Sequence, residues 1–315
     1  MKMDLIDVTL RDGGHAVKFD WGLDLAREYY QTISDIESVS LIELGYWKQT
    51  AKTTNTFYNL NENVLSKIVG PSPSKKVSVM IDYHYCQKEM SHYSKEMRDM
   101  VGMIRVCTRK TDISNSLPFA IKLKEYTQIP VSLNIFNISN YSKSEISDVS
   151  TRVSEYNLDY VYFADTHGSL DFEFDSDRFA DSVSLLKSCG IKVGMHLHDH
   201  QGRAYSNYKF LKQIGFTGFD ASTRGMGKGV GNLRLEHVVN QHEVVKIMEL
   251  VSKYGDVFTM KESPYGIIAS KYNITDYYGY HAQKKSMSII EFDRICASIT
   301  GLDKDVFNAS ILENT

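Results

Sequence analysis

The stretch KVGMHLHDH (residues 192–200) joins a short apolar run to a group of histidines. The run has the length and composition expected of a strand buried in a parallel sheet. Residues two apart on a strand point to the same side, so His196 and His198 can direct two imidazoles at one point. Two imidazoles and one carboxylate form a metal site that keeps open positions for water or substrate. Because paired histidines also occur by chance, the prediction depends on finding a carboxylate close by.

Seven further β-rich runs lie in the first 225 residues, with helix-length amphipathic segments between them. The eight runs are LIDVTL (5–10), SLIELGY (40–46), VSVMIDY (77–83), MIRVCT (103–108), PVSLNIF (130–136), YVYFAD (160–165), KVGMHLH (192–198) and GFDAST (218–223). Each interval leaves room for one crossover helix, which parallel strands require. Helices are expected at residues 23–36 and 144–156, the second with Ser144 as its N-cap.

The placement of unusual polar residues decides between a closed barrel and a doubly wound open sheet, since both alternate strands and helices. These residues lie at the carboxyl ends of predicted strands: Arg11, Asp12, His15, Asp165, His196 and His198. Barrel enzymes build their active sites on that face. Closure also makes strands one, seven and eight neighbours, which brings Asp12 to the two histidines. The predicted fold class is therefore α/β, a (β/α)8 TIM barrel with a C-terminal helical extension.

The pattern changes near residue 240, where strands give way to helices rich in tyrosine. We expect a catalytic barrel domain at residues 1–240 and a C-terminal helical extension at residues 241–315. No internal repeat or low-complexity segment interrupts this arrangement.

Composition limits the classes of partner. The net charge is -3, and Lys and Arg are scattered, so no nucleic-acid partner is expected. No apolar run approaches the roughly 20 residues of a membrane span, and charged residues occupy the place of a signal peptide's apolar stretch. The four cysteines (Cys86, Cys107, Cys189 and Cys296) are far apart, as expected of free thiols. We expect a cytoplasmic location and no membrane association.

The segment TLRDGGH (9–15) supplies the carboxylate and two further candidate groups. Beside the ligand Asp12, the guanidinium of Arg11 can stabilise an enolate oxygen with a permanent charge. His15 can act as a general base near neutral pH. In the structural alternative, Arg11 is an ion-pair partner and His15 a loop residue. Gly13 and Gly14 permit close approach of the backbone, as expected of an active-site loop.

The loop GMGKGVGN (225–232) alternates glycine over four positions. It lacks the ending of a nucleotide P-loop, and it does not follow the first strand of a dinucleotide-binding fold. Three interpretations stay open: the loop binds phosphate, as in many barrels; it bends so that Asn232 offers its amide oxygen to the metal; or it is a structural turn.

Together, four ordered motifs resemble those of the DRE-TIM metallolyase superfamily. TLRDG (9–13), ADTHG (164–168), HLHDHQGRAYSN (196–207) and GMGKGVGNLRLE (225–236) occur in that family's order and approximate spacing. The superfamily includes hydroxymethylglutaryl-CoA lyase, isopropylmalate and homocitrate synthases, and 4-hydroxy-2-oxovalerate aldolase. The synthases and the CoA lyase typically have glutamine at the position of His15, whereas the aldolases have histidine. The resemblance is therefore nearest to the aldolases.

The resemblance implies a function and a set of roles. The expected reaction is cleavage of a 4-hydroxy-2-oxo acid to pyruvate and an aldehyde, with Mn or Mg as the metal and Zn as an alternative. The implied metal ligands are Asp12, His196 and His198, with Asn232 as a candidate fourth. Arg11 would steady the pyruvate enolate and His15 would handle the hydroxyl proton. Thr166, where relatives more often have serine, would help to seat the carboxylate. A catalytic tyrosine would come from the extension, as Tyr278 or a neighbour.

The same motifs leave several rival functions open. The runner-up is a Claisen-type acyltransferase that condenses an acyl-CoA with a 2-oxo acid; His15 and the short chain speak against it. Amidohydrolases carry their HxH pair on the first strand, and non-haem iron oxygenases usually adopt a jelly roll. A Schiff-base aldolase needs a strand-end lysine, for which only Lys110 stands near a strand end. A non-catalytic barrel that acts by interaction is the rival from another class.

The sequence leaves the physiological aldehyde undetermined. The loops at residues 46–60 and 84–95 would select it, and their aromatic residues can equally serve packing. A homo-oligomer is compatible with the sequence. Related aldolases bind an acylating dehydrogenase through their extension, but this extension is divergent and predicts no partner.

Overall fold

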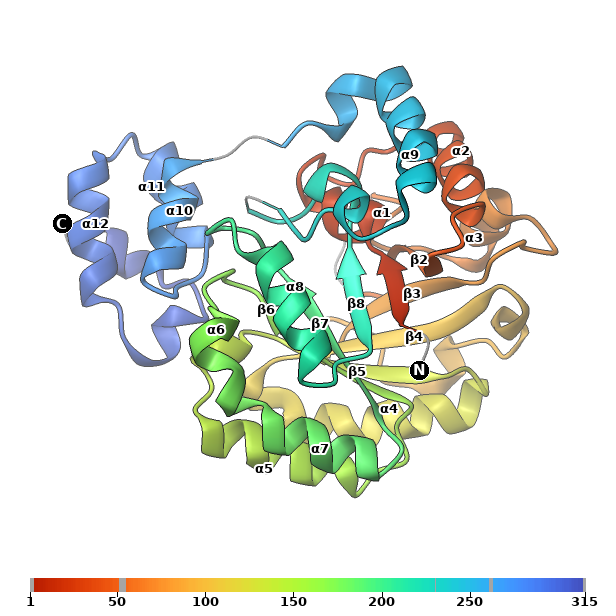
Figure 1. Cartoon of the computed structure of the whole chain (residues 1–315), viewed down its shortest axis with the longest axis horizontal. Helices are drawn as coiled ribbons and strands as arrows, with labels where there is room; N and C mark the ends of the chain where they lie inside the picture. The colour runs from red at the N-terminus through yellow and green to blue at the C-terminus, as the bar shows by residue number, and fades with distance from the viewer. Residues whose placement is uncertain (1–2, 51–54, 230, 261–262, 314–315) are drawn as a thin grey trace.

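Eight parallel strands form a closed barrel in the order of the chain, which confirms the predicted TIM-barrel fold (Figure 1). The computed structural model describes residues 3–50, 55–229, 231–260 and 263–313. The strands are β1 (Asp4–Asp7), β2 (Val39–Tyr46), β3 (Val77–Asp82), β4 (Val101–Thr108), β5 (Val131–Ile135), β6 (Tyr160–Asp165), β7 (Lys192–Leu197) and β8 (Gly218–Ala221). Each lies within or next to one of the eight predicted runs.

Pairing of the first and last strands closes the barrel. Asp4 lies opposite Gly218, and the register continues to Asp7 opposite Ala221. Strand β1 ends before its predicted limit because residues Thr9–Asp12 turn into the short helix α1. That turn carries Arg11 and Asp12 into the mouth of the barrel, next to β7 and β8.

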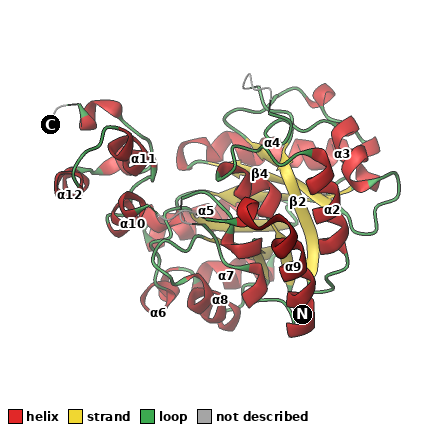
Figure 2. Ribbon diagram, turned by 90° about the horizontal axis from the view of Figure 1, so that it is seen from above, coloured by secondary structure: helices red, strands yellow, loops and turns green. Residues whose placement is uncertain are grey.

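Helices surround the barrel, as the alternation of elements predicted (Figure 2). They are α2 (Leu23–Ser34), α3 (Glu62–Val69), α4 (Ile113–Thr127), α5 (Lys143–Ser154), α6 (Phe172–Asp175), α7 (Ala180–Ser188) and α8 (Ala204–Gln213). Ser142, not Ser144, caps α5: the Ser142 side chain accepts from the backbone N–H of Glu145, and the Glu145 carboxylate accepts from the backbone N–H of Ser142. This capping box satisfies two backbone donors at once, which explains the shifted start.

The C-terminal region contains α9 (Gln241–Tyr254), α10 (Pro264–Lys271), α11 (Tyr277–Lys284) and α12 (Ile289–Ser298). Helix α9 packs on α2 as part of the barrel: Lys253 and Tyr254 contact Glu28, and Glu243 accepts from Ser38. Helices α10 to α12 form an apolar cluster of their own, set beside the barrel in Figure 1. The division expected at residue 240 stays a prediction; this packing leads us to propose that a separate unit begins after α9.

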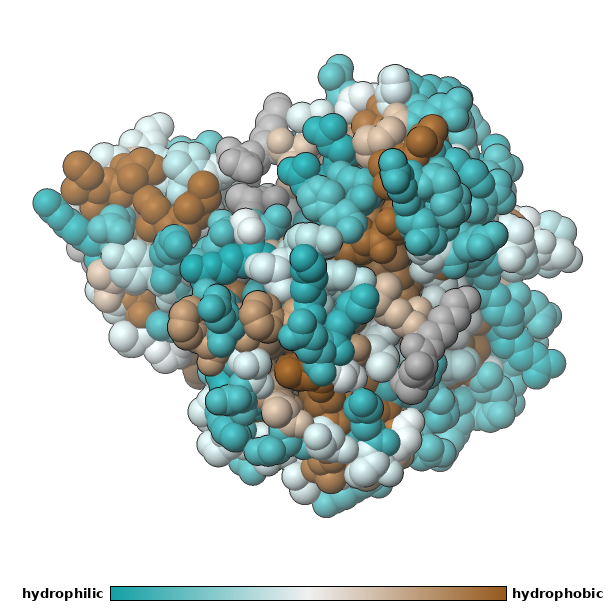
Figure 3. All heavy atoms as spheres, viewed as in Figure 1, coloured by the Kyte–Doolittle hydropathy of each residue, from teal (hydrophilic) through white to brown (hydrophobic). Residues whose placement is uncertain are grey.

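The surface and the cysteines complete the description. On the face shown in Figure 3, apolar atoms gather over the C-terminal helices, where Ile289 and Ile290 are exposed. All four cysteines are free, and three of them are buried. Among the described helices, none has the length and apolar character needed to cross a membrane.

Candidate metal centre and its cavity

The carboxyl ends of the strands open into a cavity of about 530 Å³. The barrel lines it with residues that include Arg11, Asp12, His15, Tyr46, Thr166, His196 and His198. The C-terminal helices and the loop after them line it with Thr275, Tyr277, His281, Leu302, Asp305, Val306 and Phe307. The cavity therefore lies between barrel and extension, on the face where TIM-barrel enzymes carry their active sites.

Asp12, His196 and His198 form a buried cluster with the donor set of a divalent-metal site. Each offers one ligand atom, and these atoms all lie within 4.8 Å of one another. The two imidazole Nε2 atoms are 3.2 Å apart, and Nε2 of His196 lies 3.8 Å from Oδ2 of Asp12. Convergence of two ring nitrogens and a carboxylate oxygen leaves their lone pairs directed at a common space, which suits one cation.

The orientation of His196 is fixed from behind by Asp220. Its Nδ1 lies 2.9 Å from Oδ2 of Asp220. A carboxylate in this position accepts a hydrogen bond from Nδ1–H, which keeps the proton on Nδ1 and leaves the lone pair of Nε2 for a metal. Asp220 is fully buried in β8, and its pKa is lowered: burial opposes ionisation, but Arg105 and His196 outweigh it. The pair is therefore an anion holding an imidazole in the tautomer that ligation requires.

Asn232 completes the surroundings of the cluster. Its Nδ2 donates to Oδ2 of Asp12 at 2.7 Å and to the Met226 carbonyl at 3.0 Å. Its Oδ1 and the Nδ1 of His198 are buried without a hydrogen-bond partner in the described structure. Leaving such a group unpaired costs about 1–3 kcal/mol. A buried amide oxygen with no donor beside two imidazoles and a carboxylate fits a cation-binding site, so the residues present suit the metal that the resemblance implies.

The glycine-rich loop bends back over the metal cluster, although the amide nitrogen of Asn232, not its oxygen, contacts Asp12. It brings Asn232 to Asp12, and the backbone N–H of Lys228 also donates to Asp12 at 3.3 Å. Gly227 is needed for this approach, because a Cβ there would lie 2.5 Å from Nδ2 of Asn232 and 2.7 Å from Oδ2 of Asp12. The loop thus closes one side of the cluster.

A buried chain of alternating charges supports the centre, and sequence reasoning missed it. Nε of Arg11 donates to Glu43 at 2.9 Å, and Arg11 also contacts Asp12. Arg105 bridges Glu43 at 2.9 Å and Asp220 at 2.7 Å, with two hydrogen bonds to each. Buried charges persist only when paired in this way. The available signal was a charged residue inside each of three otherwise apolar strand runs.

The balance of these charges favours a cation. Asp12, Glu43 and Asp220 are matched by only two guanidiniums, those of Arg11 and Arg105. Although burial acts to raise the pKa of Asp12, Arg11 and the neighbouring imidazoles bring it well below its usual range. The centre consequently has an excess of one negative charge, which a divalent cation would reverse. The reversed sign would then attract an anionic substrate.

His15 and Thr166 both line the cavity. Nε2 of His15 lies 3.3 Å from the hydroxyl of Tyr46. Burial lowers the pKa of His15 to about 4, so the imidazole is neutral near pH 7 and can accept a proton. Oγ1 of Thr166 accepts from the backbone N–H of Asn137 at 2.9 Å and donates to the Ala164 carbonyl at 3.4 Å, a long hydrogen bond that a ligand would have to replace. His167, by contrast, turns away from the metal cluster to contact Asp305 at 3.1 Å.

Tyr278, the tyrosine predicted from the extension, does not line the cavity. Its ring is fully buried in the cluster of α10 to α12, and its hydroxyl accepts from the backbone N–H of Asn308 at 3.1 Å. Successive helix residues point about 100° apart, and it is Tyr277 that lines the cavity. The burial of Tyr278 outside the cavity therefore argues against a catalytic role for it. Tyr277 is the tyrosine of α11 that lines the cavity and that a substrate can reach.

Two lysines line the cavity, Lys110 and Lys228, and both are engaged in ion pairs. Lys110 contacts Glu145 at 2.6 Å, and Lys228 contacts Asp276 at 2.8 Å. Burial acts to lower the pKa of Lys228, but Asp276 and Tyr277 raise it above its ordinary value. A protonated amine is a poor nucleophile, so this geometry gives no support to a Schiff-base aldolase.

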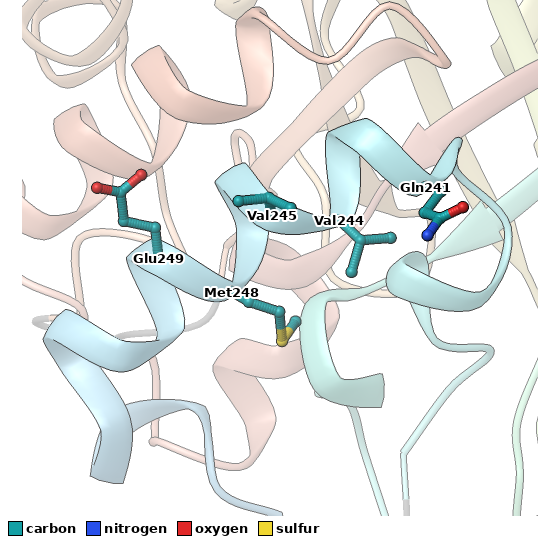
Figure 4. Close-up of a pocket in the computed structure, with 5 residues that line it drawn as sticks. All are labelled: Gln241, Val244, Val245, Met248 and Glu249. Atoms are coloured by element: carbon teal, nitrogen blue, oxygen red, sulfur yellow. The ribbon is translucent and has the colours of Figure 1, made fainter.

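A second depression, of about 720 Å³, lies on the outer side of α9 (Figure 4). It is lined by Gln241, Val244, Val245, Met248 and Glu249. Glu249 is its one titratable group, and the close-up shows no side chain that converges on another. The chemistry therefore belongs to the cavity at the mouth of the barrel.

Comparisons with known proteins agree with this geometry. The family model described as HMGL-like matches residues 2–257. A 4-hydroxy-2-oxovalerate aldolase from Geobacillus genomosp. 3 is 25% identical over 238 residues, covering 75% of this chain and 68% of its own length. An oxaloacetate decarboxylase from Mycobacterium tuberculosis is 21% identical over 249 residues, covering 75% of this chain and 68% of its own length.

Solved structures repeat the fold. The N-terminal domain of a putative aldolase from Bacteroides vulgatus superposes with a TM-score of 0.75 at 19% identity, covering 93% of this chain and 99% of that one. At this identity the likeness establishes the fold alone. It extends beyond the barrel into the C-terminal helices, because the covered share exceeds the part matched by the family model.

Proposed function

We propose a function for this chain from one premise: it belongs to the HMGL-like family. The function is that of a divalent-metal-dependent aldolase, a carbon–carbon lyase that cleaves a 4-hydroxy-2-oxo acid to pyruvate and an aldehyde. The observation that carries the proposal is the convergence of Asp12, His196 and His198 in one buried cluster beside Arg11. Curated aldolases among the relatives support the same reaction class.

The metal would be held by Asp12, His196 and His198, with Asn232 as a candidate fourth ligand. Mn or Mg is proposed, with Zn as the alternative, since carboxylate and amide oxygens suit the harder ions and imidazoles suit all three. When bound, a divalent cation supplies Lewis acidity and a template for the carboxylate and keto oxygens of a 2-oxo acid.

Arg11 is positioned to stabilise developing negative charge. Glu43 anchors its Nε and Asp12 contacts its Nη1, while Nη2 makes no hydrogen bond within the described chain. Because these two carboxylates already fix the guanidinium, it needs little reorganisation to stabilise an enolate oxygen that forms next to it. We therefore assign Arg11 to the enolate oxygen of the pyruvate half.

His15 is proposed as the base for the substrate's 4-hydroxyl. Its neutral imidazole accepts the hydroxyl proton, the C3–C4 bond breaks, and the bonding electrons pass to the pyruvate half as an enolate. The freed C4 carbon becomes the aldehyde carbonyl. Return of one proton to C3 of the enolate gives pyruvate, so that atoms and charge balance without a redox partner. Tyr46 lies 3.3 Å from His15 and can support its orientation.

Thr166 is assigned to the substrate carboxylate, because it lines the cavity and its hydroxyl makes only a long, 3.4 Å hydrogen bond to the Ala164 carbonyl, which a carboxylate could replace. The small-molecule partner is thus a 2-oxo acid. A homo-oligomer and a cytoplasmic location stay predictions from the sequence, and the divergent extension gives no basis for proposing an acylating dehydrogenase partner.

Oxaloacetate decarboxylation is the second candidate, because one relative is an oxaloacetate decarboxylase. It would form the same pyruvate enolate from a substrate that loses carbon dioxide instead of an aldehyde. Both reactions use the same ligands and Arg11, but only the aldol reaction requires a base for a hydroxyl proton. His15 therefore favours the aldolase.

The test is a screen for pyruvate release from 4-hydroxy-2-oxo acids of increasing length, with oxaloacetate as an additional substrate. Protein stripped with a chelator should be inactive and should recover when Mn²⁺ or Mg²⁺ is restored. His198→Ala should stay inactive at every metal concentration, because this variant lacks one of the three assigned ligands. If none of the hydroxy acids released pyruvate, the aldolase proposal would be refuted. Release of pyruvate from oxaloacetate alone would show that the chain is a decarboxylase instead.

A further inference from the structure

The cavity is larger than a small substrate requires. Its volume of about 530 Å³ falls in the range of roughly 300–1,000 Å³ typical of pockets that enclose drug-sized ligands. Pyruvate and a two-carbon aldehyde would occupy only the part next to the metal cluster. The remaining part, which we call the outer cavity, is lined by Tyr58, Asp82, Tyr85, Arg109 and Tyr277 among others.

The outer cavity contains three tyrosines, of which Tyr85 and Tyr277 are 41% and 51% exposed. Tyr58, Tyr85 and Tyr277 line it, and none of their phenol oxygens has a hydrogen-bond partner in the described structure. Tyr58 continues a wall that begins at the metal cluster, since its ring lies 5.1 Å from that of Tyr46. Burial, then the nearby Asp82 carboxylate and the other two phenols, raise the pKa of Tyr58 to about 12. The three phenols thus line one space, and Tyr58 stays protonated near pH 7.

The charged groups around this space are already neutralised by partners. Arg109 makes two hydrogen bonds to Asp82, at 2.9 and 3.2 Å. The two lysines of the cavity are paired with Glu145 and Asp276. An anionic tail on the aldehyde would find no cation in surplus there. Paired carboxylates and guanidiniums instead offer acceptors and donors side by side, which is what a hydroxyl needs because it both donates and accepts.

We propose that the aldehyde half of the substrate is a polyhydroxylated aldehyde of aldose type, bound in the outer cavity by Tyr58, Tyr85, Tyr277 and the Asp82–Arg109 pair. This inference rests on the proposed aldolase function. In the synthetic direction, C3 of the pyruvate enolate bonds to the aldehyde carbon, and the carbonyl oxygen takes up one proton to become the new 4-hydroxyl. The hydroxyls farther along the aldehyde do not react and serve only for recognition.

The test compares aldehydes matched in carbon number that differ only in their hydroxyls. Glyceraldehyde is paired with propanal and erythrose with butanal, each at equal free-aldehyde concentration, with pyruvate and Mn²⁺ or Mg²⁺ present. Sites built to hydrogen-bond a hydroxyl discriminate strongly against analogues that lack it. We expect kcat/KM to be about 10-fold or more higher for the hydroxylated member of each pair, and the ratio to be larger for erythrose.

Two conservative variants assign the preference to the outer cavity. Tyr58→Phe and Tyr85→Phe remove one hydroxyl each and keep the ring, so each should reduce the erythrose-to-butanal ratio several-fold, mainly through KM. Tyr205→Phe is the matched control, because this residue lies on the exposed side of α8, away from the cavity, and should leave the ratio unchanged.

Three results would overturn the inference. Equal or better turnover of the apolar aldehydes, or a ratio unaffected by both variants, would refute the substrate class alone, provided that the enzyme still exchanges the C3 hydrogens of pyruvate with solvent. Absence of that metal-dependent exchange would refute the aldolase function and this inference together.

Discussion

At the scale of single residues, Asp220 controls the centre without being a ligand. It accepts from Nδ1 of His196 at 2.9 Å and holds Arg105 through both carboxylate oxygens. Carboxylates in this position fix the ring and raise its basicity, and their loss typically costs 10–100-fold in metal affinity. The quality of the metal site therefore depends on a residue of β8 that the substrate never contacts.

We predict that Asp220→Asn lowers the affinity for Mn²⁺ about 10–100-fold while the barrel still folds. The amide keeps one acceptor for Arg105 but no longer presents a negative charge to the imidazole. Titration calorimetry on chelator-treated protein measures the affinity. Asp4→Asn is the matched control, because Asp4 pairs with Lys192 at the opposite end of the barrel. Wild-type affinity in a folded Asp220→Asn protein would contradict the assigned role.

Asp165 provides a pH test of a different kind. Burial raises its pKa to about 7 in the folded protein, although the backbone N–H groups of Ser169 and Leu170 donate to it. A raised folded pKa adds stability that is complete below the unfolded value near 3.8 and is lost as the pH rises through about 7.

We therefore expect the free energy of unfolding of wild type, relative to Asp165→Asn, to fall between about pH 4 and pH 7 and then level off. The slope should approach 1.4 kcal/mol per pH unit at most, the value for one proton. Urea unfolding of both metal-free proteins measures it, and residues common to both, such as Asp7, cancel. A difference that is flat or rises over this window would show that Asp165 ionises normally.

The candidate metal ligands could be predicted from the sequence, but the residues that orient them could not. Asp12, His196 and His198 lie at or just beyond the carboxyl ends of strands, where a polar side chain is conspicuous. Glu43 and Arg105 lie within apolar runs, and nothing in a single sequence tells an inward charged side chain from an outward one. Their pairing became visible only when the register placed β2, β4 and β8 around one interior.

At the scale of elements, the loop between β8 and α9 shapes the site through its glycines. Gly227 lies against both Asn232 and Asp12, at distances that no Cβ can occupy without displacing them. The segment is also tied to α11, since Lys228 pairs with Asp276. One loop thus connects the metal cluster to the extension.

We predict that Gly227→Ala lowers metal affinity about 10-fold or more, since a loss of ~1.4 kcal/mol in binding suffices for that change. The added methyl would displace Asn232 and Asp12, and the rest of the barrel should fold as before. Calorimetry with Mn²⁺ again gives the affinity. Gly255→Ala serves as control, because a Cβ there meets no atom within 4 Å. Equal affinities for the two variants would show that the close approach at Gly227 is unimportant.

Elements were predicted better than their ends. All eight strands occur where apolar β-rich runs were identified, because burial on both faces imposes that composition. The exceptions have local causes: the helical turn Thr9–Asp12 shortens β1, and the capping box moves the start of α5 to follow Ser142. The choice between Tyr277 and Tyr278 depended on the rotation of one helix against the barrel, which periodicity in a tyrosine-rich segment does not fix.

At the scale of the whole molecule, closure of the barrel and docking of the extension create the site together. Closure makes β1, β7 and β8 neighbours, so ligands far apart in the chain meet. The C-terminal helices then cover the mouth and contribute Tyr277 and His281 to the cavity. Closure of the barrel could be predicted from the eight strand-like runs in the sequence. Docking of the C-terminal helices depends on tertiary packing, which the sequence pattern does not reveal.

The central claim is that this chain binds one divalent cation at Asp12, His196 and His198 and uses it with Arg11 to stabilise a pyruvate enolate. The most direct measurement follows deuterium entry into C3 of pyruvate in D₂O, because exchange needs the enolate but no particular aldehyde. We predict exchange by wild type with Mg²⁺ or Mn²⁺, and none after chelation or in His198→Ala. Failure of the metal-loaded wild type to exchange, or exchange by His198→Ala at the same rate, would contradict the account.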